Sequence, residues 1–372
     1  MDGIDTFREG AHTVRIVTDR HKFAKFRRRW NTALAQYPEA SMYMTHEWLQ
    51  ALWDIYEDDI VGQVMMIDDK EGPCAMAPFV SVKYRYGGFS IPAVGPIPAA
   101  RTDIPLIRDQ IECMRLLGNY TKSWGAQLWH LHNVPERSPV IQLLHSEWDV
   151  GRTVEEYDHE AFPVIDTSTS WPQFLQSRDE EFHEEVAGIH AGLEGLELRP
   201  ITDAAPLLAI MNRVKKRSGL GESPIDDFRQ TAFNERIIQE AASAGTLRSM
   251  VAFDQTLFAE PAVGFTIGIE YNGTLHILET GGDQRYPSAG IGTFAEMLWG
   301  AFDNDKVRCF DVSELDSSAQ AERAWAKDSN PHLSTLILNG GMGSAAVRAG
   351  RTLGGLKRAF ALPKLRRSDE AA

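Results

Sequence analysis

The sequence is poor in cysteine: Cys74, Cys113 and Cys309 are the only three among 372 residues. Their spacing does not match the short Cys-x-x-Cys pairs of zinc-binding motifs, and three cysteines make no disulfide framework. His130 and His132 would share one face of a predicted strand, but the pattern supplies no third ligand. We therefore expect no bound metal, no structural disulfide and a reducing compartment.

Long apolar runs are also lacking. No stretch approaches about 18 consecutive apolar residues, the length that a transmembrane helix needs. The N-terminal segment MDGIDTFREG is polar and acidic, and it contains no apolar core of a signal peptide. The sequence therefore predicts a cytoplasmic protein.

Positive charge is scarce: the whole chain has 38 Lys and Arg residues against 52 Asp and Glu residues, for a net charge of −14. Because DNA binding depends on cations that neutralise phosphates, we expect no DNA partner. The exception is the segment 341–372, in which seven Lys and Arg residues accompany two acidic residues. This basic tail is predicted to be flexible, with peripheral contact to an anionic membrane surface as the alternative.

Two domains are expected, because 43% of the 372 residues are hydrophobic and the length suits roughly two packed cores. In each half the patterns predict a strand, two helices, an antiparallel meander, a helix, a strand, a helix and a final strand. Asn272-Gly273 is a hairpin signal in the second meander, whereas the Gly- and Pro-rich stretch 87–105 is expected to be irregular. We predict two α/β (α+β) domains over residues 1–165 and 166–340, each a mixed, mostly antiparallel, twisted sheet flanked by helices.

Two glycines stand where a strand of the second half gives way to a helix. The stretch Gly290-Ile291-Gly292 leads directly into a predicted apolar helix over 292–303. Backbone N–H groups at a helix N-terminus bind anions, and glycine lets a phosphate approach the backbone. The pattern predicts a phosphate cradle, with a plain loop before a helix as the alternative. A side chain of Arg285 that points into the same cleft would favour the cradle.

This order of elements, with a glycine pair between the fourth strand and its helix, resembles the GNAT acyltransferase fold. Over about residues 10–340 the chain looks like the tandem-domain CelD-like acyltransferases found beside polysaccharide-synthesis enzymes, a group similar in fold to the Fem peptidyltransferases. The resemblance is carried by 43-YMTHEWLQALWDIY-56, 76-MAPFV-80 and the block 246–339. The GNAT phosphate motif resembles Q/R-x-x-G-x-G/A; it is matched at Gly290 and Gly292, whereas Pro287 occupies its leading position.

The resemblance implies an acyl-CoA-dependent acyltransferase whose second domain binds acetyl-CoA or a longer acyl-CoA. The first domain has no glycine pair at the matching place, so it is expected to shape the acceptor site without binding a donor. The acceptor would be an amine of a small molecule, a sugar or an envelope-polymer precursor, with envelope-polysaccharide synthesis machinery as a partner. Two alternatives stay open: a Fem-like transferase that uses aminoacyl-tRNA, and a non-catalytic scaffold protein of polysaccharide biosynthesis. The residues predicted to bind the donor are Arg285, Ala289, Gly290, Ile291, Gly292 and Thr293.

Several residues near the predicted donor site are candidates for catalysis. Glu279, near the end of the fourth strand, suits a general base that deprotonates the acceptor ammonium, and the alternative is an ordinary strand carboxylate. Asp311 and Ser313 alternate onto one face of the next strand. They would orient the acceptor or protonate the leaving thiolate, unless they cap the following helix. Tyr286 and Tyr271 are candidates for a general acid.

The basic run 213-RVKKR-217 ends a predicted helix. Cations at a helix C-terminus favour the helix dipole, and a solvated surface accounts for such a run. The functional alternative is contact with an anionic acceptor.

Overall fold

The structure, a computed structural model, consists of two compact units. Among the residues that the structure describes, unit 1 comprises those up to Ala161 together with 331–339, and unit 2 comprises those within Phe162–Asn330. Unit 2 thus begins near the predicted boundary at 165/166, while residues 331–339 belong with unit 1. The predicted tail 341–372 lies outside the described residues. These are 3–57, 61–86, 89–96, 101, 103–126, 128–146, 152–218, 228–258, 261–313 and 320–339.

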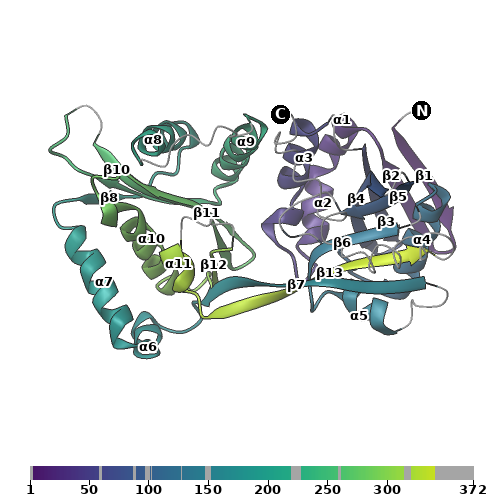
Figure 1. Cartoon of the computed structure of the whole chain (residues 1–372). Helices are drawn as coiled ribbons and strands as arrows, with labels where there is room; N and C mark the ends of the chain where they lie inside the picture. Colours follow the sequence, from purple (N-terminus) through teal and green to yellow (C-terminus); the bar gives the residue numbers. More distant parts are fainter. Residues whose placement is uncertain are drawn as a thin grey trace. The chain divides into compact units, whose positions relative to one another are not determined.

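Unit 1 has a sheet with the strand order β1-β2-β3-β4-β5-β6-β13 and helices that flank it (Figure 1). Strands β5 and β6 run parallel, and the other neighbouring pairs are antiparallel. Its elements are β1 (Ile4–Glu9), β2 (His12–Val17), α1 (Arg20–Phe23), η1 (Ala24–Phe26), α2 (Arg27–Leu34), η2 (Met42–Met44), α3 (His46–Ile55), β3 (Val61–Asp69), β4 (Gly72–Tyr86), β5 (Phe89–Pro96), α4 (Gln110–Ser123), β6 (Leu128–Pro135), α5 (Pro139–Ser146) and the start of β7 (Arg152–Asp166).

Unit 2 repeats this plan. Its sheet has the order β12-β11-β10-β9-β8, in which β11 and β12 run parallel and the other pairs are antiparallel. The elements are α6 (Trp171–Gln176), α7 (Glu180–Gly192), β8 (Glu197–Arg199), α8 (Ala204–Arg217), α9 (Phe228–Ala244), β9 (Leu247–Phe253), β10 (Ala262–Tyr271), β11 (Thr274–Gly282), α10 (Pro287–Phe302), β12 (Cys309–Asp311), α11 (Gln320–Ala324) and the start of β13 (Asp328–Asn339). The predicted fold class is confirmed.

The two halves of the chain exchange their last strands. The end of β7, over Val164–Asp166, pairs antiparallel with β12 of unit 2. In return, β13 pairs antiparallel with β6 of unit 1, with His332 opposite Pro135. The final strand of each half therefore completes the sheet of the other half. This exchange explains why residues 331–339 belong with unit 1 and not with the half that precedes them.

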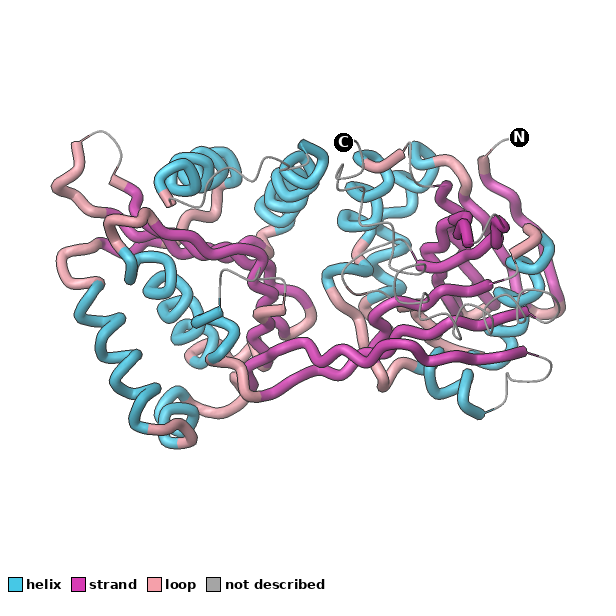
Figure 2. Tube along the Cα trace, viewed as in Figure 1, coloured by secondary structure: helices cyan, strands magenta, loops and turns pink. Residues whose placement is uncertain are grey.

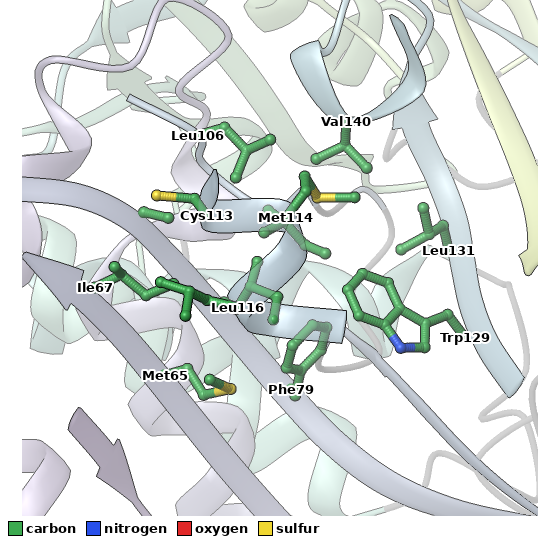
Figure 3. Close-up of a cluster of buried hydrophobic side chains, with 14 of the residues drawn as sticks. Met65, Ile67, Phe79, Leu106, Cys113, Met114, Leu116, Trp129, Leu131 and Val140 are labelled. Atoms are coloured by element: carbon green, nitrogen blue, oxygen red, sulfur yellow. The ribbon is translucent and has the colours of Figure 1, made fainter. Parts of the chain in front are cut away.

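One hydrophobic core cluster of unit 1 lies between the sheet and α4. Figure 3 shows apolar side chains from β3, β4, α4 and β6 that converge on one another. Phe79 and Trp129 pack edge to face with ring centroids 5.1 Å apart, a favoured arrangement for aromatic rings. The Trp129 indole N–H donates to the Thr121 hydroxyl at 2.8 Å, so its one polar group is satisfied inside the core.

In unit 2, helices cover both faces of the sheet. Helices α7 and α10 lie against one face, and α8 and α9 lie against the other (Figures 1 and 2). The α10 face holds an apolar cluster in which Phe294 of α10 packs edge to face on Phe310 of β12, with ring centroids 5.4 Å apart. Leu275 and Ile277 of β11 belong to the same cluster. The face toward α8 is therefore the one left for polar side chains of β11.

Glycines allow α10 to lie very close to β10 and β11. A Cβ on Gly264 would come 2.6 Å from the carbonyl carbon of Ala289. A Cβ on Gly290 would come 3.1 Å from the carbonyl carbon of Gly281 and 3.2 Å from the nitrogen of Gly282. Because backbone atoms cannot move aside as the end of a side chain can, glycine is required at this contact.

The local predictions had mixed outcomes. The Asn272-Gly273 hairpin is confirmed: both residues have positive φ, 47° and 78°, as a type I′ turn requires. The expectation that 87–105 is irregular was wrong, because β5 pairs with β4 over Phe89–Pro96. Such pairing depends on a partner strand and not on the local Gly and Pro content. Among the described residues, no helix has the length and apolar character needed to cross a bilayer.

We expect Gly290→Ala to lower the free energy of unfolding by about 1–3 kcal/mol, the usual cost of overpacking. Gly300→Ala, on the same helix, is the matched control, because nothing lies within 4 Å of a Cβ at that position. The better helix propensity of alanine should leave stability there unchanged or raise it by up to about 1 kcal/mol. Urea unfolding followed by circular dichroism measures both variants, and equal effects would contradict the packing role of Gly290.

Candidate active site

A β-bulge in β11 decides which of its side chains face α8. Glu279 and Ile277 pair with consecutive residues of β10, so Leu278 is the extra residue. Ile277 faces the apolar cluster beneath α10, and its neighbour His276 therefore faces the opposite side. Because the extra residue shifts the alternation by one, Glu279 shares the face of His276.

Contacts on both sides of the sheet agree with this shifted alternation. The Oε1 atom of Glu279 lies 2.6 Å from Nζ of Lys215 on α8. The next residue, Thr280, points the other way and donates its hydroxyl to the Gly290 carbonyl of α10 at 3.3 Å. The Glu279 side chain is 26% exposed and that of Lys215 is 45% exposed. Such a partly exposed ion pair is screened by solvent and contributes little to stability.

Asp311 lies on the same face, directly opposite His276 in the parallel register of β12 and β11. Its carboxylate contacts Nδ1 of His276 at 3.1 Å. It also accepts from the backbone N–H of Ser313 at 3.0 Å and from the Ser313 hydroxyl. Asp311 and His276 are both buried. Asp311 thus lies on the face of the sheet that carries Glu279, and its carboxylate is in a position to orient the His276 ring.

The ladder between β11 and β12 ends at this point. Within the described parts of both strands, pairing covers Thr274–His276 against Cys309–Asp311 and stops there, whereas β11 continues to Gly282. The edge of β11 beyond His276 therefore lacks a β12 partner in these residues. Backbone N–H groups along such an edge are suited to polarise a carbonyl oxygen.

A buried carboxylate occupies the loop that precedes α10. The Asp283 side chain is fully buried, and its Oδ2 lies 2.6 Å from Nη2 of Arg285 and 3.2 Å from Nε of Arg217. Hydrogen bonds from Arg285 lower the pKa of the Asp283 carboxyl, and the nearby charge of Arg217 acts in the same direction. Arg217, at the end of the basic run on α8, also donates to the Ala262 carbonyl. Part of that run therefore holds the site together and is not merely a solvated surface.

The N–H groups near the start of α10 are largely used within the protein. Those of Gln284, Tyr286 and Ala289 donate to main-chain carbonyls at 2.8–3.2 Å, and that of Arg285 donates to the Asp283 carboxylate at 3.0 Å. The Asp283 N–H donates to a β10 carbonyl at 2.8 Å, and Pro287 has no N–H. The structure therefore already occupies several of the donors that a phosphate would need.

The residues predicted to bind the donor lie mostly inside α10. The helix begins at Pro287, so Gly290 and Gly292 fall within its first two turns. A Cβ on Gly292 would meet the Leu193 side chain at 2.5 Å. The Thr293 hydroxyl donates to the Gly290 carbonyl at 2.7 Å. Ala289, like these three, is buried, and Ile291 is half-buried. The glycines thus have a packing role that the sequence did not reveal, and the phosphate cradle stays a prediction.

Tyr286 contacts a carboxylate from another strand end. Its hydroxyl donates to Asp254, which follows β9, and this hydrogen bond raises the pKa of the Tyr286 phenol. Tyr286 is therefore protonated at neutral pH, as a general acid must be. The side chain of the preceding residue, Arg285, is 55% exposed, and its guanidinium donates a hydrogen bond to the Asp283 carboxylate.

Sequence reasoning missed Asp283, His276 and the pairing of Lys215 with Glu279. A single aspartate after two glycines gives no local signal of a functional site. A histidine within an apolar strand gives none either. The only signal for Lys215 was the basic run, since cations gathered at the end of a helix can also serve a neighbouring anion.

No protein-family model and no curated protein matches the chain. Solved structures do resemble it in fold. FemX superposes with a TM-score of 0.58 at 9% identity, over 84% of this chain and 96% of that one. A conserved protein of unknown function from Bacteroides thetaiotaomicron gives 0.53 at 14%, over 90% and 99%. L-PGS from Bacillus licheniformis gives 0.50 at 13%, over 91% and 98%. At such identities the likeness establishes the fold.

Asp283→Asn tests the buried carboxylate through the pH dependence of stability. A folded-state pKa below the unfolded value adds stability that is complete above about pH 4, the ordinary aspartate pKa, and is lost as the pH falls through the folded value. We expect the variant to be less stable than the wild type at pH 7 and the difference to shrink steadily below about pH 4. Thermal melts between pH 7 and pH 3 measure this, and a constant difference would contradict it.

Proposed function

We propose that unit 2 transfers an acyl group from an activated donor to an amine, with Glu279 as the general base. The observation that carries the proposal is the bulge at Leu278, which turns a partly exposed carboxylate toward α8 beside a strand edge that β12 leaves unpaired in the described residues. The GNAT-like order of elements and the fold shared with FemX and L-PGS support the same class.

The reaction needs one proton acceptor and one polarised carbonyl. An acceptor ammonium takes the place of Lys215 beside Glu279 and loses a proton to that carboxylate. The free amine nitrogen then attacks the carbonyl carbon of the acyl donor, whose oxygen accepts from N–H groups along the edge of β11. A C–N bond forms, the nitrogen loses its second proton, and the bond from the acyl carbon to the leaving group breaks. The leaving group takes up a proton as it departs.

Two further residues have supporting roles in this scheme. The protonated Tyr286 phenol is the candidate that donates to the leaving group, after release from Asp254. Asp311 acts through His276: it holds a buried imidazole at the last pair of the β11–β12 ladder. Asp311 is thus proposed as a positioning residue and not as the proton donor suggested by its sequence pattern.

Acyl-CoA, acetyl or longer, is the donor that the GNAT-like fold favours. Its pyrophosphate would lie near the start of α10, where the helix dipole and the half-exposed Arg285 supply positive potential. The proposed acceptor is an amine of a small molecule, a sugar or an envelope-polymer precursor. A role in polysaccharide biosynthesis is part of the proposal because the CelD-like resemblance suggests it. A cytoplasmic location is also part of the proposal, because the sequence shows no signal-peptide pattern.

A second donor is favoured by one observation. The buried carboxylate of Asp283 already holds Arg285, and the loop uses its own N–H groups, so an incoming phosphate meets competition at the start of α10. A donor that does not depend on that loop, such as the aminoacyl-tRNA of a Fem-like transferase, avoids this competition. The chemistry at Glu279 is the same for both donors, except that the leaving group is a ribose hydroxyl and not a thiol.

Glu279→Gln should lower kcat/KM by about 10²–10⁴-fold, the usual contribution of a general base, because the amide cannot accept the ammonium proton. Thiol release from acetyl-CoA in the presence of a panel of amino sugars and small primary amines provides the assay, and a melting curve checks that the variant is folded. Lys215→Met is the matched control. It removes only a partly exposed ion pair and should retain activity. Wild-type turnover by Glu279→Gln would exclude this residue as the base.

Arg285→Ala should weaken the binding of acetyl-CoA about tenfold, because a charge-assisted contact to phosphate is lost. Lys216→Ala, which removes an exposed cation of α8, should leave binding unchanged. Calorimetric titration measures both variants. If the wild-type chain binds neither acetyl-CoA nor a long-chain acyl-CoA, but transfers an amino acid from aminoacyl-tRNA, then the donor is aminoacyl-tRNA and not acyl-CoA.

A further inference from the structure

Three metal-binding side chains that are far apart in the sequence meet in unit 1. His12 lies at the start of β2, Cys74 near the start of β4, and Cys113 in the first turn of α4. Each offers one ligand atom, and the three atoms all lie within 4.8 Å of one another. All three residues are buried. A buried imidazole beside two thiols is a ligand set that Zn²⁺ prefers.

The backbone around these ligands is fixed by its own hydrogen bonds. The N–H groups of Ile107 and Arg108 donate to the Cys74 carbonyl at 2.7 and 3.1 Å, which joins the segment before α4 to β4. Arg108 also bonds to Asp69 and Glu71 in the β3–β4 turn, each at 2.9 Å. The ligands are thus carried by strands and a helix that are tied together, as a preformed metal site requires.

The imidazole of His12 contacts the carboxylate of Asp109. Nε2 of His12 lies 3.0 Å from Oδ2 of Asp109, which fixes the orientation of the ring. The Asp109 side chain is 51% exposed, so this partner of His12 reaches solvent. Asp109 immediately precedes α4 and has a left-handed backbone, with φ 44°.

The charge balance of the ligands suits an apolar site. Cys113 packs among the core side chains drawn in Figure 3. Binding of Zn²⁺ would release two thiol protons to solvent, and the two thiolates would neutralise the ion.

We propose that His12, Cys74 and Cys113 bind Zn²⁺, with a water molecule as the fourth ligand. Zinc–ligand bonds of about 2.0–2.3 Å imply distances of roughly 3.6–3.8 Å between tetrahedral ligands, so the side chains need only a small contraction. The sequence predicts no metal because these residues follow no ligand spacing rule; the fold brings them together. The site ties β2, β4 and α4 of unit 1, and it does not depend on the function proposed for unit 2.

The test uses the full chain produced in zinc-supplemented medium and purified without chelators. Plasma mass spectrometry should find about one zinc ion per chain, as one four-ligand site predicts, and melting after chelation should occur at a lower temperature than before. Unfolding and refolding with Co²⁺ should give the near-ultraviolet absorption of cobalt–thiolate bonds. The variant C74S/C113S should lose the zinc and this absorption, whereas the matched control Cys309→Ser, which changes the half-buried cysteine of unit 2, should keep both.

Two results would overturn the site. One is a wild-type zinc content no higher than that of C74S/C113S together with no cobalt–thiolate absorption. The other is a Cys74–Cys113 disulfide found by mass spectrometry of the unreduced chain. If the double variant does not fold, alkylation of the wild type decides: zinc should slow the labelling of Cys74 and Cys113 but not that of Cys309, and equal labelling with and without zinc would contradict the proposal.

Discussion

The short distance between α10 and the strands β10 and β11 is the constraint on which unit 2 depends. Gly264, Gly282 and Gly290 leave no room for a side chain at that contact. Because α10 is held there, the loop before it is held as well, and this loop carries Asp283 between two arginines. A substitution at one of these glycines would therefore displace groups of the candidate site that it does not touch.

The same contact bears on how a donor can bind. A helix start attracts anions when its N–H groups are open, but the loop before α10 supplies an anion of its own. A phosphate brought to this place would share the guanidinium of Arg285 with a buried carboxylate, and it would gain less than it would at an open helix start. A donor of the proposed transfer would therefore gain less at the start of the helix than the helix dipole alone suggests.

The element order and the hairpin at Asn272-Gly273 could be predicted because their signals are local: apolar periodicity and residues that tolerate positive φ. Glu279 could be placed on its strand for the same reason. Its partner Lys215, the bulge at Leu278 and the exchange of final strands could not be predicted, since each depends on register or pairing between distant segments. The glycine pair of α10 was interpreted as a phosphate cradle; in the structure Gly290 packs on the backbone of β11 and Gly292 packs on the Leu193 side chain.

The exchange of final strands sets an order for folding during synthesis. Unit 2 can complete its sheet edge with β7, which the ribosome has already released when β12 appears. Unit 1 waits much longer, because β6 must remain without its neighbour until β13 emerges. A nascent chain therefore carries an open strand edge in its N-terminal half through most of translation, and a product cut short before residue 331 would keep that edge exposed to pairing with other chains.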